Sequence, residues 1–121
     1  MIDFPPEIVE VLNHDNLVLA GSAAAGHYLN DISQIGDYDF MLQSRNDPNH
    51  QAVFNLSLVL ENDGWQYNGK TSFGGLKLSK NGVNIDIFFG DLFTLPFILG
   101  YKTPQYLYYP KENKFVKISG V

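Results

Sequence analysis

The sequence predicts a mixed α/β (α+β) domain, in which a mixed, mostly antiparallel β-sheet carries helices packed on one side. Segments with helical periodicity alternate with short apolar runs that are typical of strands. The dipeptide Asn81-Gly82 lies between two runs of alternating apolar residues, which is the strongest short signal for a β-hairpin. The 121 residues, 45% of them hydrophobic, suffice for one core, so a single domain over residues 1–121 is expected.

The first third of the chain is expected to alternate between helix and strand. A short helix is predicted over residues 5–12, because the proline pair at its start is tolerated in a first turn. Residues 17–20 are all apolar and predict a short buried strand. The next helix is expected over residues 23–29, with the Ser22 hydroxyl as its N-cap. Residues 37–43 then form the second strand.

A longer helix is expected over about residues 50–61, and the polar segment 62–64, which ends in glycine, stops it. Its apolar face is predicted to consist of Val53, Leu56, Val59 and Leu60. Residues 65–73 predict a strand, with Asn68-Gly69 as a turn or a bulge.

The last third of the chain is expected to be mostly β-structure. Residues 75–90 form the hairpin around Asn81-Gly82. The apolar segment 92–99 predicts a short helix, and residues 106–118 predict two strands around a turn at 110–113.

The composition excludes several classes of function. The net charge of −5 argues against a generic electrostatic grip on DNA or RNA. The absence of cysteine excludes disulfides, thiolate metal sites and cysteine catalysis. No apolar run approaches the roughly 18 residues of a membrane span, and the N-terminus does not have the pattern of a signal peptide. We therefore expect a soluble, cytoplasmic protein with no membrane association.

A two-residue turn at Asn81-Gly82 determines the register of the predicted hairpin. In that register Lys77 lies opposite Asp86, and Leu78 lies opposite Ile85. Because side chains alternate between the two faces of a strand, one face is apolar and the other polar. The apolar face consists of Leu76, Leu78, Ile85 and Ile87.

Three aspartates are expected on the polar faces of otherwise apolar strands. Asp37 and Asp39 point to the same face, while the core face of their strand consists of Tyr38, Phe40 and Leu42. If this strand neighbours the one that carries Asp86, the three carboxylates converge and repel one another. A divalent cation relieves that repulsion, and oxygen ligands suit Mg²⁺ or Mn²⁺, of which two ions could hold the attacking and leaving oxygens of a phosphoryl transfer. The alternative is a set of separate, exposed acids at strand edges.

The dipeptide Gly21-Ser22 separates the first predicted strand from the helix that follows it. Such a turn leaves free backbone N–H groups at the positive end of a helix, which is a common phosphate site. Gly21 lets the backbone approach a ligand closely, and the Ser22 hydroxyl adds a donor. The same turn also occurs in strand–helix connections without a ligand.

The order of Gly21-Ser22, Asp37-Tyr38-Asp39 and Asp86 resembles that of the polymerase-beta-like nucleotidyltransferase superfamily, over about residues 17 to 90. That family combines a Gly-Gly or Gly-Ser turn, two aspartates one residue apart, and a third carboxylate on a later strand. The resemblance implies a nucleotidyltransferase-like core in a minimal, single-domain member. It also implies transfer of a nucleoside monophosphate from a nucleoside triphosphate (NTP) to a hydroxyl, with release of pyrophosphate.

The resemblance assigns a role to each of these residues. Asp37 and Asp39 would bind two Mg²⁺ or Mn²⁺ ions, and Asp86 would bind the catalytic ion and help to deprotonate the acceptor hydroxyl. Gly21 and Ser22 would hold the triphosphate of the NTP. The acceptor would be a protein, a small molecule or an RNA end.

Other interpretations stay open. One is a nucleotidyltransferase-fold module that binds nucleotide or regulates a partner without turnover, such as an antitoxin-like protein. Another is unrelated metal or phosphate binding on a mixed sheet. Lys77 either contacts the triphosphate or forms a cross-strand charge pair with Asp86. The aromatic tail allows an interface with a protein partner or with a second copy of the chain.

Several other polar and aromatic residues are expected to have structural roles. His27 is expected to pack or to lie at the surface, and Asp91 is expected to cap a helix rather than join the acids. The aromatic residues at 65, 67 and 106–109 could stack on a base, but packing in the core or at an interface is the expectation for most of them.

Overall fold

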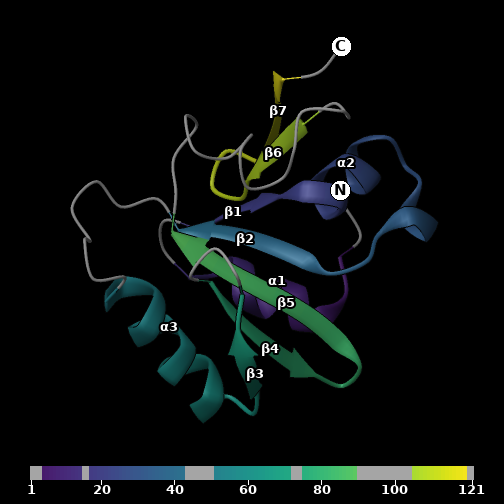
Figure 1. Ribbon diagram of the computed structural model, residues 1–121. Helices are drawn as coiled ribbons and strands as arrows, with labels where there is room; N and C mark the ends of the chain where they lie inside the picture. Colours follow the sequence, from purple (N-terminus) through teal and green to yellow (C-terminus); the bar gives the residue numbers. More distant parts are fainter. Residues whose placement is uncertain (1–3, 15–16, 43–50, 72–74, 90–104, 120–121) are drawn as a thin grey trace.

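The computed structural model describes residues 4–14, 17–42, 51–71, 75–89 and 105–119. Within these residues, seven strands form one mixed sheet in the order β3-β4-β5-β2-β1-β6-β7 (Figure 1). The strands are β1 (Leu17–Ala20), β2 (Tyr38–Leu42), β3 (Gln66–Lys70), β4 (Leu76–Lys80), β5 (Val83–Phe89), β6 (Gln105–Tyr109) and β7 (Lys114–Ser119). Among these neighbours β2 and β5 run parallel, and the other pairs are antiparallel. The expected mixed, mostly antiparallel sheet is therefore confirmed.

Three α-helices in the described residues pack against one face of the sheet: α1 (Pro6–Leu12), α2 (Gly21–Tyr28) and α3 (Gln51–Asn62). A 3₁₀ turn, η1 (Ile32–Gln34), follows α2. Figure 1 shows α3 beside β3 and β4, and α2 near β1 and β6. Each helix contributes to one core cluster, whose members include Ile8, Val11, Ala23, Ala24, Phe40, Val53, Leu60, Leu78 and Ile85. In the described part of the chain, no helix combines the length and the apolar character needed to cross a membrane.

Helix α2 begins two residues earlier than the sequence predicts. Its N-cap is Ala20, which makes no side-chain capping hydrogen bond, so the prediction of Ser22 as the N-cap is wrong. The reason is Gly21, whose backbone has a φ of +65°. Glycine tolerates this left-handed conformation, so the chain turns directly out of β1 into the helix. Ser22 consequently lies inside the first helical turn.

Helix α3 also differs from its prediction on one face. Val53, Leu56 and Leu60 are buried as expected, but Val59 is 45% exposed. The buried stripe instead passes through Ser57, which is 2% exposed and donates a hydrogen bond to the Phe54 carbonyl at 2.6 Å. That bond satisfies the buried hydroxyl, so a serine is tolerated at a position expected to be apolar.

The hairpin has the predicted register. Asn81 and Gly82 form its turn with positive φ values of 52° and 80°, as a two-residue type I′ turn requires. Lys77 pairs with Asp86, and Leu78 pairs with Ile85. The four predicted core residues, Leu76, Leu78, Ile85 and Ile87, are all buried.

The remaining predicted elements are confirmed where the structure describes them. The register of β3 shifts between Tyr67 and Gly69, which is the expected bulge. β6 and β7 form the expected antiparallel pair in the tail. The helix predicted at 92–99 lies outside the described residues.

A second apolar cluster lies on the sheet face opposite the helices. It consists of Val18, Ala20, Met41, Phe88 and Leu107, all buried. The alternation in the sequence predicts only the first face as core. The central strands are thus apolar on both faces over part of their length, which is typical of strands that are buried on both sides.

Candidate functional site

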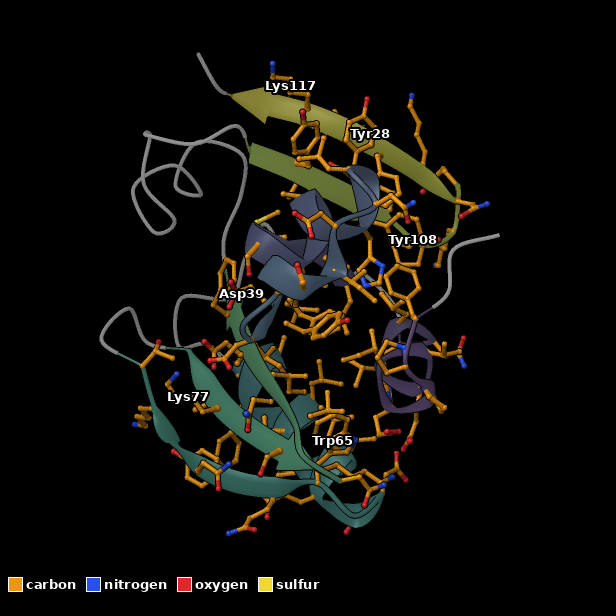
Figure 2. The ribbon with its side chains drawn as sticks, turned by 90° about the vertical axis from the view of Figure 1, so that its right-hand side faces the viewer. Tyr28, Asp39, Trp65, Lys77, Tyr108 and Lys117 are labelled. Carbon is orange, nitrogen blue, oxygen red and sulfur yellow. The ribbon has the colours of Figure 1, made fainter. Side chains whose placement is uncertain are left out.

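Two of the predicted aspartates meet in the parallel pairing of β2 with β5. Asp39 is the register partner of Asp86, and Asp86 is the register partner of Lys77 across the hairpin. Register partners share a face of a sheet, so the three side chains form a row across three neighbouring strands. Figure 2 shows Asp39 and Lys77 on the side of the sheet that faces away from Trp65, which belongs to the main core.

Asp37, Asp39 and Asp86 form an acidic cluster, and the Lys77 ammonium lies between the carboxylates of Asp37 and Asp86. The ammonium lies 3.3 Å from Asp86 Oδ1, 3.5 Å from Asp86 Oδ2 and 3.8 Å from Asp37 Oδ2. Asp37 precedes β2 directly, and its side chain is 43% exposed, whereas that of Asp86 is 18% exposed. The expected cross-strand pair of Lys77 with Asp86 is therefore confirmed, and it extends to Asp37.

The electrostatic environment of Asp39 is strongly perturbed. Burial is the main cause that raises the pKa of its carboxyl to about 7, from an ordinary value of 3.8. The charges of Asp86 and Asp37 and a side-chain hydrogen bond with Asp86 raise the pKa further, and Lys77 opposes them.

The burial of Asp39 follows from its position at the border of the second apolar cluster. Its partner across the strand pair is Ala20, and Met41 follows on the same face of β2. Ionisation of the Asp39 carboxyl is consequently costly in the absence of a cation.

Gly21 brings the predicted phosphate turn against this aspartate. It follows Ala20, the register partner of Asp39, so its backbone lies beside the Asp39 side chain. A Cβ at position 21 would overlap the Asp39 carboxylate, and the φ of +65° also favours glycine. The close approach to Asp39 and the positive φ therefore both favour glycine at this position.

The first turn of α2 begins at Gly21, whose backbone lies beside the Asp39 carboxylate. The first four N–H groups of a helix have no partner within the helix, and the N-cap residue Ala20 gives those of α2 no side-chain hydrogen bond. Ser22 lies in this turn and is exposed, so its hydroxyl is available to a ligand. Gly21 thus lies beside Asp39, which is the register partner of Asp86, and Ser22 is the next residue along the chain.

The donor chemistry of the site fits a hard divalent cation. Among the described residues, no group of three or more His, Cys, Asp or Glu side chains is arranged to hold one ion together. Asp39 and Asp86, on neighbouring strands, supply two carboxylates, and Mg²⁺ commonly takes one or two carboxylates together with substrate phosphates and water. A cation between them would relieve the crowding that raises the pKa of Asp39.

Residues around the site have the structural roles that were expected. His27 Nε2 lies 3.0 Å from the Tyr38 hydroxyl, and its ring packs against that of Phe4, with 4.4 Å between the ring centroids. The packing expected of His27 is thus confirmed.

The contact between His27 and Tyr38 was not predicted, and it joins α2 to the strand that carries the acids. The sequence signal for it was the alternation that turns Tyr38 toward the helices, on the face opposite its two acidic neighbours.

Most of the aromatic residues considered for base stacking are buried: Trp65, Tyr106 and Tyr108 are 2%, 9% and 6% exposed. Tyr67 is 41% exposed. Asp91 lies outside the described residues, so the predicted cap is not placed.

Comparisons with protein-family models, with curated proteins and with solved structures find no match to this chain.

Proposed function

We propose that this protein is a metal-dependent nucleotidyltransferase, which moves a nucleoside monophosphate from an NTP to a hydroxyl acceptor and releases pyrophosphate. The observation that carries the proposal is the contact of Gly21 with Asp39, opposite Asp86. The turn that opens α2 and the carboxyls of Asp39 and Asp86 are brought together by the pairing of β1, β2 and β5, which supports this proposal. Separate, solvent-exposed acids would not require a glycine against one of them.

The proposed roles follow from position and exposure. Backbone N–H groups at Gly21 and Ser22 hold the triphosphate, and Asp39 and Asp86 hold Mg²⁺ or Mn²⁺, with Asp37 at the exposed side of the cluster. The ions, when bound there, would supply positive charge for the phosphates and for the attacking and leaving oxygens. Asp86, paired with Lys77 and partly exposed, accepts the proton of the acceptor hydroxyl.

The bond changes of the proposed reaction balance. The acceptor oxygen bonds to the α-phosphorus, and the bond from that phosphorus to the bridging oxygen breaks. Pyrophosphate leaves with the electron pair of the broken bond. The acceptor proton passes to Asp86 and from there to solvent, so the carboxylate is regenerated.

One observation favours a second candidate, a nucleotide-binding or regulatory module without turnover. Lys77 already neutralises part of the acidic cluster, through its contacts with Asp86 and Asp37. A protein that retains the site for nucleotide binding alone would benefit from such an internal cation. The two candidates differ in whether a labelled product forms.

The test uses each of the four NTPs, labelled at the α-phosphate, with Mg²⁺ or Mn²⁺ and a lysate of the source cells as the supply of acceptors. Label on a macromolecule or small molecule is expected with wild type and not with Asp39→Asn. A parallel reaction with γ-labelled NTP should leave the acceptor unlabelled, because the γ-phosphate departs in pyrophosphate. NTP binding without any labelled product would support the second candidate instead.

A further inference from the structure

The ammonium of Lys77 occupies the position of a counter-ion in the acidic cluster. It approaches both carboxylate oxygens of Asp86, at 3.3 and 3.5 Å, and Asp37 Oδ2 at 3.8 Å. Asp86 is one of the two residues to which the proposed function assigns metal binding, and Asp37 lies at the exposed side of the same cluster. A lysine ammonium has three donors and no acceptor, so it serves the carboxylates as a hydrogen-bond donor and as a positive charge.

The Lys77 side chain is free to leave this position. It is 45% exposed, and it carries its charge on a flexible four-carbon stem. The ion pair is exposed on the lysine side, and its ammonium lies 3.3 Å or more from the carboxylate oxygens, so only a modest free energy holds the ammonium in place. Asp86 is only 18% exposed and belongs to the centre of β5, so the carboxylate stays while the lysine moves.

Charge determines which cation the cluster prefers. The carboxyls of Asp37, Asp39 and Asp86 carry up to three negative charges, and Lys77 supplies one positive charge. A divalent cation offers more charge to the same oxygens, and the like charges of the cation and the ammonium repel each other at such short range. The two cations therefore compete for the cluster.

We propose that Lys77 is a built-in counter-ion, which yields the carboxylates to a divalent cation and then binds the phosphates of the incoming NTP. The inference rests on the proposed function, because it concerns the order of binding at that same site. In the ligand-free protein Lys77 holds the acids together. Once the cation is bound, the released ammonium is within the site and adds a positive charge for the triphosphate. Lys77 thus couples metal binding to nucleotide binding.

This role predicts opposite effects on the two ligands. Lys77→Met removes the competitor, so the affinity for Mn²⁺ alone should rise by about two- to fivefold, the worth of an exposed ion pair. The same change removes a phosphate contact, so NTP binding in the presence of metal should weaken by roughly three- to tenfold. If Lys77 only supported the fold, Lys77→Met would weaken the affinity for Mn²⁺ and the affinity for the NTP together.

The experiment measures free Mn²⁺ by electron paramagnetic resonance, and binding of α,β-methylene NTPs with Mg²⁺ by calorimetry. Lys80→Met is the matched control. Lys80 is also on β4 and forms an ion pair with Glu10 at 3.2 Å, away from the acids. Lys80→Met should leave the affinities for Mn²⁺ and for the NTP analogue unchanged. Lys77→Arg keeps the positive charge and should bind Mn²⁺ with the wild-type affinity. It therefore shows whether a change in Lys77→Met comes from the lost charge or from loss of folding.

The results separate this inference from the proposed function. Opposite shifts in Lys77→Met, with neither in Lys80→Met, would support the counter-ion role. Unchanged or weaker Mn²⁺ binding by Lys77→Met, in a protein that still labels an acceptor, would overturn the inference alone. If neither wild type nor Lys77→Met binds Mn²⁺ or an NTP analogue, the proposed function and the inference are both overturned.

Discussion

Asp39 of β2 and Asp86 of β5 are direct partners in the parallel pairing of their strands, and the charge of Asp86 helps to raise the pKa of the Asp39 carboxyl. Two neighbouring carboxyl groups repel each other once both are ionised. The pairing therefore connects the stability of the protein to pH and to cations.

The first prediction is a pH dependence of the metal-free protein. Because the pKa of Asp39 rises from 3.8 to about 7 on folding, the folded chain binds this proton more tightly than the unfolded chain. The resulting stabilisation is complete below about pH 4 and is lost as the pH rises through 7. Urea unfolding in EDTA should show the free energy of unfolding falling by up to about 1.4 kcal/mol per pH unit across this range.

Asp39→Asn is the control for that pH dependence, because it removes the titrating group at nearly constant volume. The difference in the free energy of unfolding between wild type and variant should change with pH by the expected slope, since the other titrating groups are common to both. The variant should be at least as stable as wild type at pH 8 without metal, and should have no transferase activity. A wild-type slope that persists in the variant would mean that Asp39 does not titrate in this range.

The second prediction concerns ligands. Mg²⁺ or Mn²⁺ together with an NTP should raise the melting temperature more than either alone, because the cation neutralises the acids and the phosphates complete its coordination. A thermal shift series over the four NTPs measures this effect. Asp86→Asn should abolish the combined shift. Absence of any shift in wild type with millimolar NTP and either metal would count against the proposed function.

The third prediction compares two glycines with positive φ. Gly21→Ala places a Cβ against the Asp39 carboxylate, whereas the space beside Gly82 is open. The backbone conformation alone should cost each alanine variant about 1–2 kcal/mol. Gly21→Ala should cost more than Gly82→Ala in urea unfolding, and only Gly21→Ala should reduce NTP binding. Equal losses of stability in the two variants would show that a Cβ at position 21 does not collide with the Asp39 carboxylate.

The fourth prediction uses the two faces of β4. Leu78 is 1% exposed in the main core, so Leu78→Ala should cost about 2–5 kcal/mol. Lys77 is 45% exposed, so Lys77→Ala should change the free energy of unfolding by less than about 1 kcal/mol. Chemical denaturation of the two variants measures both values. The reverse order would contradict the register of the hairpin, and with it the position of Asp86.

The structure of the hairpin could be predicted because its information is local. A two-residue turn determines the register of its flanking strands, and alternation then assigns each side chain to a face. For the same reason the sequence by itself placed Lys77 beside Asp86 and Leu78 in the core. The start of α2 was predicted less well, because the conformation of Gly21 decides where the helix begins.

The sequence alone thus determined the elements, most of their faces and the individual residues of the candidate site. Only the tertiary structure decided that β2 lies beside β5, in parallel, so that Asp39 meets Asp86. Alternation specifies the face of a side chain, but it contains no information on which strands become neighbours. Parallel partners are joined by a long connection, so no local turn sets their register. The burial of Asp39 likewise arises from the second apolar cluster, which forms only when β1, β2, β5 and β6 assemble in one sheet.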